Sequence, residues 1–316
     1  MADVSAERLN NLQGRLALIL GNGAGQNGYG QTLESYPVSK TDGSVIRAAD
    51  INAIYADMVK VRIHQIGTSP TEIAELVSNL NIIAEETSFY INEQGISVTD
   101  EYGELKGILD YEELMSVIEA NKMLAASSQV TLESGITSSR TAQWNGLITH
   151  EFTVNFTNGD HRRHFFNSGG SIRISGSNSG ANGEKGKDWN QLLLRTGGVT
   201  FNWNSTVPGN EGSGSQIGNY ALTSSYQEIY RKQGSSIGST YSQLYGNNLY
   251  TIEARSASTS SIQFKVKFND LSTDYNPSVD NNVDGRLYSV VQHTRAAGSS
   301  TVDVLAPTYT NNVSLS

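Results

Sequence analysis

The sequence predicts an α+β protein of more than one domain, in which an N-terminal helical module precedes an antiparallel β-sandwich with one short helix. Composition is the first observation: only 17% of the 316 residues are charged, and 31 glycines stand beside 5 prolines, which is typical of short strands joined by polar turns. Charge distribution is the second. Up to Ser127 the chain holds 8 Lys and Arg against 18 Asp and Glu, and from Ser128 onward 14 against 13. We therefore expect residues 1–127 to form a helical assembly and anchoring module and residues 128–316 to form the sandwich.

Two segments of the acidic half repeat one amphipathic pattern. Residues 6–16 can be laid over residues 48–58, and their apolar side chains coincide at spacings of three and four residues. This spacing places the apolar side chains along one face of a helix, and Ser5 can cap the first helix. A helix with a single apolar face needs a partner, which is either the other helix or another protein chain. Six side chains are expected to form this buried assembly stripe: Leu9, Leu12, Leu16, Ile51, Ile54 and Met58.

Two more helices are expected in the acidic half. Ser69-Pro70-Thr71-Glu72 combines an N-cap serine with proline at the first helical position, which predicts a third helix from Ser69 to about Phe89. Glu72 stands at the capping-box position of that helix, and Asp110-Tyr111-Glu112-Glu113 predicts the start of a fourth helix through another capping box. Residues 94–109 between them are expected to form a loop or a small hairpin.

The second half alternates polar and apolar residues. His150–Phe156 alternates, Asn158-Gly159-Asp160 indicates a turn and Arg163–Phe166 resumes, which predicts a β-hairpin. A short helix is expected at residues 188–194, with Asp188 as its cap. The other expected strands are 171–175, 199–203, 227–230, 249–254, 262–268, 285–293 and 302–305. So many short strands favour an antiparallel β-sandwich.

Several functional classes are disfavoured. The chain has no cysteine, which removes disulfides, thiolate zinc sites and cysteine nucleophiles. The aliphatic run Leu16–Leu20 is far too short for a membrane span, and the first residues lack the regions of a signal peptide, so no membrane partner is expected. A net charge of -9 opposes a nucleic-acid surface. Neither G-x-S-x-G nor H-E-x-x-H occurs, which disfavours a hydrolase. We expect no catalytic residues and no cofactor.

A glycine-rich stretch, Gly23–Gly28, fits the GxGxxG pattern of a dinucleotide-binding loop. A phosphate loop must open a helix, yet Tyr36-Pro37 follows too closely for a helix of useful length. We therefore expect a helix C-cap and a flexible turn at Gly21 instead.

Two sets of residues raise the question of a metal. His161 and His164 are three residues apart, and on a strand they would point to opposite faces, so a polar hairpin is favoured over a metal site. Four aspartates carry the oxygen donors that calcium uses: Asp270, Asp274, Asp280 and Asp284. Their spacing lacks the alternate-residue pattern of an EF-hand, which favours a solvated loop, and we expect no bound metal.

Tyrosines cluster between residues 220 and 250. Exposed tyrosines supply large contact areas at low entropic cost and suit protein interfaces or sugar stacking, whereas buried ones pack in a core or on a sheet face. The cluster contains Tyr226, Tyr230, Tyr241, Tyr245 and Tyr250, of which the first four are possible ligand contacts.

One long run carries a resemblance to a known family. The run Thr153–Ser175 reads TVNFTNGDHRRHFFNSGGSIRIS, and it is accompanied by Lys187-Asp188-Trp189, Ile262–Asp270, Pro307-x-Tyr309, the loop Asn22–Gln31 and the segment Ile51–Gln65. Together these stretches resemble virion structural proteins of tailed bacteriophages of marine bacteria, notably the contractile-tailed phages of cyanobacteria. The resemblance implies a non-enzymatic building block that is present in many copies in the particle, and it supplies no catalytic residues.

We therefore expect a structural component of a phage virion, tail-, baseplate-, fibre- or neck-associated, which assembles through its helical module. The expected partners are other virion proteins of the tail, baseplate, neck or capsid, and further copies of the chain in a trimer or ring. The acidic module would steer the chain towards basic partners. The expected location is the virion, and the host cytoplasm during assembly. An alternative is an adhesin whose sandwich binds a host surface glycan, and a third hypothesis is a glycan-cleaving enzyme.

Overall fold

The chain folds into two compact units. The computed structural model describes residues 5–21, 28–35, 40–41, 45–75, 90–91, 97–98, 107–234, 246–272, 280–298 and 300–315. The helical unit consists of residues 1–131, 163–169 and 296–304, and the sandwich unit of residues 132–162, 170–295 and 305–316. Five helices and antiparallel sheets in the described part of the chain confirm the α+β class.

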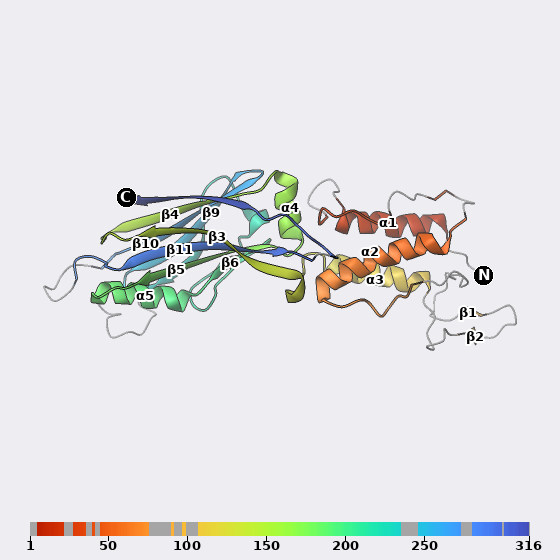
Figure 1. The fold of residues 1–316 in the computed structure, drawn as a ribbon, viewed down its shortest axis with the longest axis horizontal. Coiled ribbons are helices and arrows are strands. Elements are labelled where there is room, and N and C mark those ends of the chain that lie inside the picture. Colours follow the sequence, from red (N-terminus) through yellow and green to blue (C-terminus); the bar gives the residue numbers. More distant parts are fainter. Residues whose placement is uncertain are drawn as a thin grey trace. The chain divides into compact units, whose positions relative to one another are not determined.

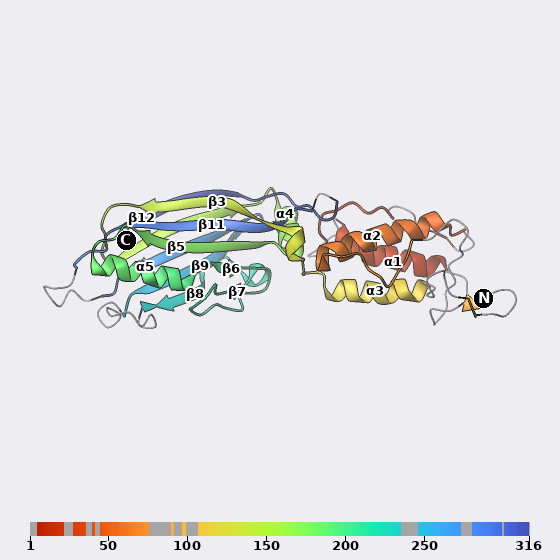
Figure 2. The ribbon, with the colours of Figure 1, turned by 60° about the horizontal axis from the view of Figure 1, so that its bottom comes forward.

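Three helices lie side by side in the helical unit: α1 (Ala6–Leu20), α2 (Ala48–Ile66) and α3 (Ile108–Ala120) (Figures 1 and 2). The expected cap of the first helix is confirmed, because the Ser5 hydroxyl accepts a hydrogen bond from the Arg8 amide at 3.2 Å. The C-cap expected at Gly21 is confirmed as well, and its amide donates to the Ala17 carbonyl. A 3-10 turn at Ser127–Gln129 follows these helices in the chain.

The other expectations for the acidic half need correction. Residues 69–75 are not helical, and residues 76–89 of the expected third helix lie outside the described residues. Instead of a helical bond, the Ala74 carbonyl accepts a hydrogen bond from the Tyr111 hydroxyl at 2.7 Å. α3 begins two residues earlier than expected, because Gly107 is its N-cap and the Asp110 carboxylate accepts from the Gly107 amide at 2.6 Å.

A small hairpin is present, although it begins before the expected range of 94–109. The strands β1 (Tyr90–Ile91) and β2 (Ser97–Val98) pair antiparallel, with Ile91 opposite Ser97.

The sandwich unit contains two five-stranded sheets (Figure 1). The first has the order β12-β4-β10-β9-β8, formed by Thr308–Leu315, Leu147–Asn155, Ser261–Asn269, Leu249–Ser258 and Gln227–Gln233. The second has the order β3-β11-β5-β6-β7, formed by Val130–Arg140, Arg286–Ala296, Ser171–Ser179, Val199–Phe201 and Thr206–Val207. Along β10 buried and half-buried residues alternate strictly, so one set of side chains forms core and the other lies on the outer face.

The expected hairpin after β4 is wrong. Residues Gly159–Asn167 form a helix, α4, and the Asn158 side chain caps it by accepting a hydrogen bond from the His161 amide at 2.8 Å. Asparagine followed by glycine and aspartate favours a turn, and it equally favours a helix start. The sandwich half of the sequence therefore contains two helices among its described residues, α4 and α5, rather than the single one expected.

α5 (Glu184–Thr196) begins four residues earlier than expected, with Gly183 as its N-cap in place of Asp188. Its side chain Trp189 is buried against Trp144 and Phe268, at ring-centroid distances of 5.3 and 5.9 Å. A further 3-10 turn lies at Asn219–Ala221.

One further expected strand is wrong, and three observed strands of the two sheets were not expected. Residues 302–305 form no strand and contribute only an isolated bridge between Ala297 and Asp303. The edge strands β3, β7 and β12 were not expected at all. Most residues of β3 are exposed or half-buried, so the apolar alternation that marks an inner strand is missing from its sequence.

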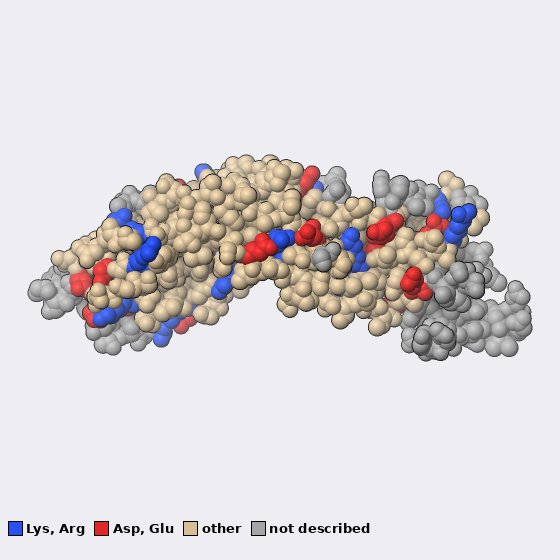
Figure 3. Space-filling model, viewed as in Figure 1, with Lys and Arg blue, Asp and Glu red and all other residues tan. Residues whose placement is uncertain are grey.

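Uncharged residues cover most of the face drawn in Figure 3, and acidic and basic side chains are scattered over it rather than gathered into one patch. Among the described helices, none combines the length and the apolar character that a membrane span requires.

Candidate functional site

The six side chains of the expected assembly stripe lie in the core of the helical unit. None of them is more than 2% exposed: Leu9, Leu12, Leu16, Ile51, Ile54 and Met58. Apolar residues of α3, among them Leu114 and Ile118, are buried in the same unit, and α3 contacts both α1 and α2. The stripe is therefore covered by the chain itself, and these side chains do not present a surface to another protein. Of the two partners expected for the stripe, the structure provides the internal one.

The four tyrosines expected as possible ligand contacts differ in their burial. Tyr230 is 1% exposed and its hydroxyl donates to the Glu211 carbonyl, so its expected ligand role is corrected to a core role. Tyr241 and Tyr245 lie outside the described residues. Tyr226 is half-buried at the surface of the first sheet and remains a candidate. Tyr250 of the same cluster is fully buried.

The aspartates considered for calcium hold the start of α5. Asp280 accepts from the Lys185 amide at 3.1 Å, and Asp284 accepts from the Gly183 amide at 3.0 Å. Asp270 forms a fully buried ion pair with the Lys185 ammonium group at 2.7 Å. The expectation of a solvated loop is therefore wrong for these three, and Asp274 lies outside the described residues. No group of three or more potential metal ligands occurs among the residues that the structure describes.

The two histidines considered for a metal lie on α4, not on a hairpin. His161 Nδ1 accepts from the Thr157 amide at 3.0 Å, so Nε2 carries the proton and donates to the Leu305 carbonyl at 2.7 Å. His164 packs over Gly30 in the helical unit, where a Cβ atom on the glycine would lie 2.4 Å from the histidine ring.

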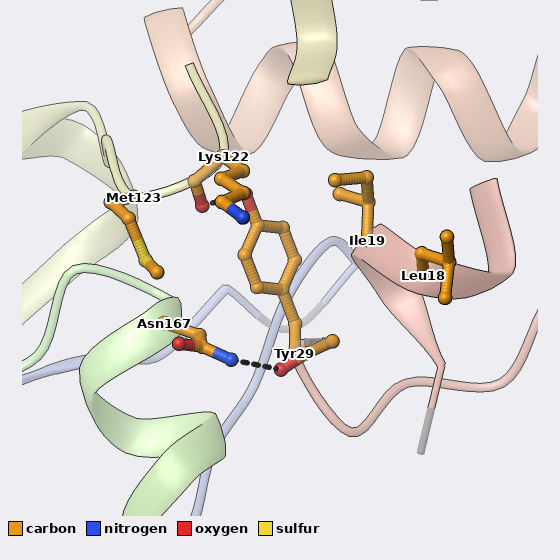
Figure 4. A pocket seen from close by; sticks show the side chains of 7 residues that line it. Leu18, Ile19, Tyr29, Lys122, Met123 and Asn167 are labelled. Carbon is orange, nitrogen blue, oxygen red and sulfur yellow. Dashed lines mark hydrogen bonds between the residues drawn. The ribbon is translucent and has the colours of Figure 1, made fainter. Parts of the chain in front are cut away.

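Three stretches that carry the family resemblance meet in the helical unit. The Asn167 amide donates to the Gly28 carbonyl at 3.1 Å, and the Tyr29 ring contacts the His64 ring at a centroid distance of 5.2 Å. The Tyr29 hydroxyl donates to the Lys122 carbonyl at 2.5 Å. Figure 4 shows the Tyr29 ring lying between α1 and the Lys122 and Asn167 segments. We call this group the glycine-loop joint.

The glycine-loop joint is packed rather than hollow. The space beside Tyr29 measures about 10 Å³, which is near the lower limit for one water molecule. Burial lowers the pKa of His64 to about 4, against the opposing effect of a backbone hydrogen bond with Ser168, so the imidazole is neutral at pH 7. Residues 28–35 contain no helix after the glycine stretch, which confirms that Gly28 does not open one. The joint therefore has the properties of a structural contact.

A different arrangement lies on the outer face of the first sheet. Strand pairing places Thr310 opposite Thr153, Thr153 opposite Gln263, and Gln263 opposite Arg255. These four side chains form one row across β12, β4, β10 and β9. Neighbouring strands are about 4.8 Å apart, so the row spans roughly 14 Å.

A second row runs parallel to the first. Its members are Asn312, Glu151, Lys265 and Glu253, again in cross-strand register. Lys265 pairs with Glu151 at 3.1 Å, and Lys267 pairs with Glu253 at 2.5 Å. The carboxylates of this face are therefore matched by neighbouring ammonium groups.

Tyr226 lies over the end of the first row. Its ring centroid is 4.6 Å from the Arg255 guanidinium carbon and 4.4 Å from the Lys265 nitrogen, and its hydroxyl contacts the Gln263 amide oxygen at 3.3 Å. Beside it is a shallow hollow of about 120 Å³, lined by Thr153, Gln263, Thr310 and their neighbours. We call the outward side chains of this region the Tyr226 face: Glu151, Thr153, Tyr226, Arg255, Gln263, Lys265, Thr310 and Asn312.

The Tyr226 face combines one aromatic ring with hydroxyl, amide and charged groups on a rigid sheet. Such an array can hold a polar ligand by hydrogen bonds while the ring packs against the apolar side of the ligand. Of its members, only Tyr226 was expected from the sequence. The alternation in the expected strands 150–156 and 262–268 predicts which of their side chains point outward. It does not predict how those side chains align across strands, because a single sequence does not reveal the strand pairing.

Comparison of the chain with models of protein families, with curated proteins and with solved structures found no match to any of them.

Proposed function

We propose that the chain is a non-enzymatic structural component of the virion of a tailed phage. The glycine-loop joint supports this proposal. The stretches that resemble phage virion proteins are far apart in the sequence, yet Gly28, His64 and Asn167 contribute to one packed joint. The residues that carry the resemblance therefore pack together and maintain the fold. This is what we expect of a structural building block.

The surface of the helical unit supports assembly with basic partners. Five exposed glutamates form no ion pair with a described Lys or Arg: Glu7, Glu34, Glu72, Glu75 and Glu113. In contrast, Arg8, Arg15 and Lys40 are each paired with a carboxylate of the same unit. Unpaired acidic side chains attract a basic surface and accelerate encounter with it at low salt. In this proposal, tail, baseplate, neck, fibre or capsid proteins and further copies of the chain are the partners.

Location in the particle tests this proposal directly. Purified virions of the source phage would be digested for mass spectrometry and labelled with gold-conjugated antibody against the chain. A stoichiometric signal at one place in the particle is expected, and a phage-encoded enzyme of DNA synthesis serves as the control for contamination. Absence of the chain from purified virions would contradict the proposal.

A second candidate function is saccharide binding by the sandwich unit, and the Tyr226 face favours it. A half-buried aromatic ring at the sheet surface, next to a row of hydroxyl and amide groups, matches a ligand with apolar ring faces and polar edges, which is the chemistry of a sugar. A glycan array with the full chain tests this candidate, with Tyr226→Ala as the comparison. Binding that persists unchanged in Tyr226→Ala would exclude the Tyr226 face as the site.

A further inference from the structure

We infer that the Tyr226 face binds an acidic saccharide, with the anionic group of the sugar on Arg255 and the sugar hydroxyls along Gln263, Thr153 and Thr310. The inference rests on the saccharide-binding candidate proposed above and adds the charge and orientation of the ligand.

The charges of the Tyr226 face are not fully balanced. Lys265 and Lys267 are each paired with a carboxylate of a neighbouring strand. Arg255 forms no ion pair with any described carboxylate, and its Nε and Nη2 atoms both donate to the Gln263 amide oxygen at 2.8 and 2.6 Å. One positive charge of this face is therefore left without a counter-charge within the described chain. A half-buried guanidinium in that position favours an anionic partner.

The Tyr226 face also offers hydrogen-bond donors to a ligand. The Gln263 amide oxygen is occupied by Arg255 and Tyr226, which leaves its NH₂ group for a ligand. In Asn312 the side-chain oxygen accepts from the Val313 amide at 2.9 Å, so here too the NH₂ group is left. Arg255 contributes its Nη1 atom, which has no partner among the described residues. A ligand rich in acceptor oxygens, such as a sugar with a carboxylate or a sulfate group, complements this array.

The side chains of the Tyr226 face are preorganised. Arg255 is held in place by its hydrogen bonds to Gln263 and by its contact with the Tyr226 ring. The Gln263 amide oxygen in turn accepts a hydrogen bond from the Tyr226 hydroxyl. All three lie on paired strands or directly before one. Side chains that are already ordered lose little rotamer entropy on binding. The row of four residues is long enough for a short oligosaccharide.

The test measures binding of the full chain to three immobilised ligand classes. These are an oligogalacturonate, which carries carboxylates and no sulfates, a κ-carrageenan oligosaccharide, which carries sulfates and no carboxylates, and a malto-oligosaccharide, which is neutral. Binding to at least one acidic class but not to the neutral class is expected, and it should weaken as salt concentration rises. The two acidic classes distinguish a carboxylate ligand from a sulfate ligand.

Variants locate the site. Arg255→Gln is expected to weaken binding about tenfold to a hundredfold, the usual loss for a hydrogen bond to a charged group, and Arg255→Lys is expected to retain part of it. Arg231→Gln is the matched control, because Arg231 belongs to the same sheet and is neutralised by Glu228 at 2.7 Å. Tyr288→Ala is the control for Tyr226→Ala, because Tyr288 has a similar contact with Arg286 on the other sheet. Circular dichroism and melting temperatures of all variants identify any that are misfolded.

The outcomes separate the inference from the functions on which it rests. Undiminished acidic binding in folded Arg255→Gln would overturn the inference. Binding of the neutral saccharide that is abolished in Tyr226→Ala would also overturn the inference of an acidic ligand. That result would still support saccharide binding at the Tyr226 face. No binding to any saccharide on a broad array would overturn both. None of these results bears on the presence of the chain in the virion, which the particle experiment decides.

Discussion

Arg8 and Glu112 form a two-pronged ion pair between α1 and α3, with Nε 2.7 Å from one carboxylate oxygen and Nη2 2.6 Å from the other. Seven residues later on both helices, Arg15 and Glu119 repeat the arrangement at 2.9 and 2.7 Å. Because both numbers increase together, α1 and α3 run parallel. The two pairs flank the apolar core of the helical unit and fix the register of these helices.

The first prediction concerns pH. The hydrogen bonds from Arg8 and Arg15 lower the pKa values of Glu112 and Glu119 below their ordinary value. A carboxylate with a lowered pKa in the folded state stabilises the fold above its unfolded pKa, and this stabilisation is lost as pH falls through the folded pKa. Each partly exposed pair contributes about 0.2–1 kcal/mol.

The measurement is denaturant unfolding from pH 7 down to pH 3. The double variant Glu112→Gln/Glu119→Gln should lose less stability over the acidic range than the natural chain, and the difference should shrink in high salt. Equal losses in both chains would show that these pairs do not contribute to the pH dependence.

The second prediction concerns the cap of α4. Asn158→Ala removes the acceptor of the His161 amide and should destabilise the chain by about 1 kcal/mol. Asn158→Asp keeps a capping oxygen at the same place and is the matched control. Thermal unfolding of the three chains measures the effect, and equal melting temperatures for Ala and Asp would contradict the capping role.

The third prediction concerns glycines of the helical unit. Gly28 has a φ angle of 92°, and a Cβ atom there would lie 1.7 Å from the Gly21 carbonyl oxygen. Gly28→Ala should therefore cost more than 1–2 kcal/mol, the penalty for the left-handed backbone alone.

Gly14 provides the opposite case for comparison. It lies within α1, and a Cβ atom there would meet no atom within 4 Å. Gly14→Ala should stabilise the chain by about 0.5–1 kcal/mol, because alanine loses less backbone entropy in a helix. Urea unfolding of the two variants should shift the midpoint in opposite directions, and a shift in the same direction would refute the explanation.

The fourth prediction concerns the buried pair Lys185–Asp270, in which both side chains are fully buried. Lys185→Met leaves a buried carboxylate without its counter-charge and should destabilise the chain by about 3–5 kcal/mol. The double variant Lys185→Met/Asp270→Leu should recover most of that loss. Lys187→Met is the control, because Lys187 pairs with Glu184 at the surface and its loss should cost less than about 1 kcal/mol. A double-mutant cycle by denaturant unfolding measures the coupling.

Periodic burial explains which elements were predictable from the sequence. The stripes of α1 and α2 and the inner strands β4, β9 and β10 have one buried face, so their apolar residues recur at the period of the element. The edge strands β3 and β12 have no such pattern, because solvent faces much of their surface. In α4 the adjacent residues Phe165 and Phe166 are both fully buried. The apolar pattern there therefore does not distinguish a helix from a strand.

The candidate site was less predictable than the fold. The sequence identified Tyr226 by composition alone and placed Tyr230 beside it, although Tyr230 belongs to the core. Arg255, Gln263 and Thr310 come from three strands, and only the pairing of those strands places them in one row. Long-range register of this kind depends on the whole fold, so no local pattern encodes it.

The composition of the helical unit from three separate stretches has a consequence for its synthesis. Residues 163–169 and 296–304 belong to this unit together with residues 1–131, and they reach the ribosome exit long after α3. At about 5–20 residues per second, the first helices wait for many seconds before their last contacts can form. The helical unit therefore begins to fold early but is completed only when residues 296–304 have emerged, so a fragment that ends near residue 127 should not reach native stability.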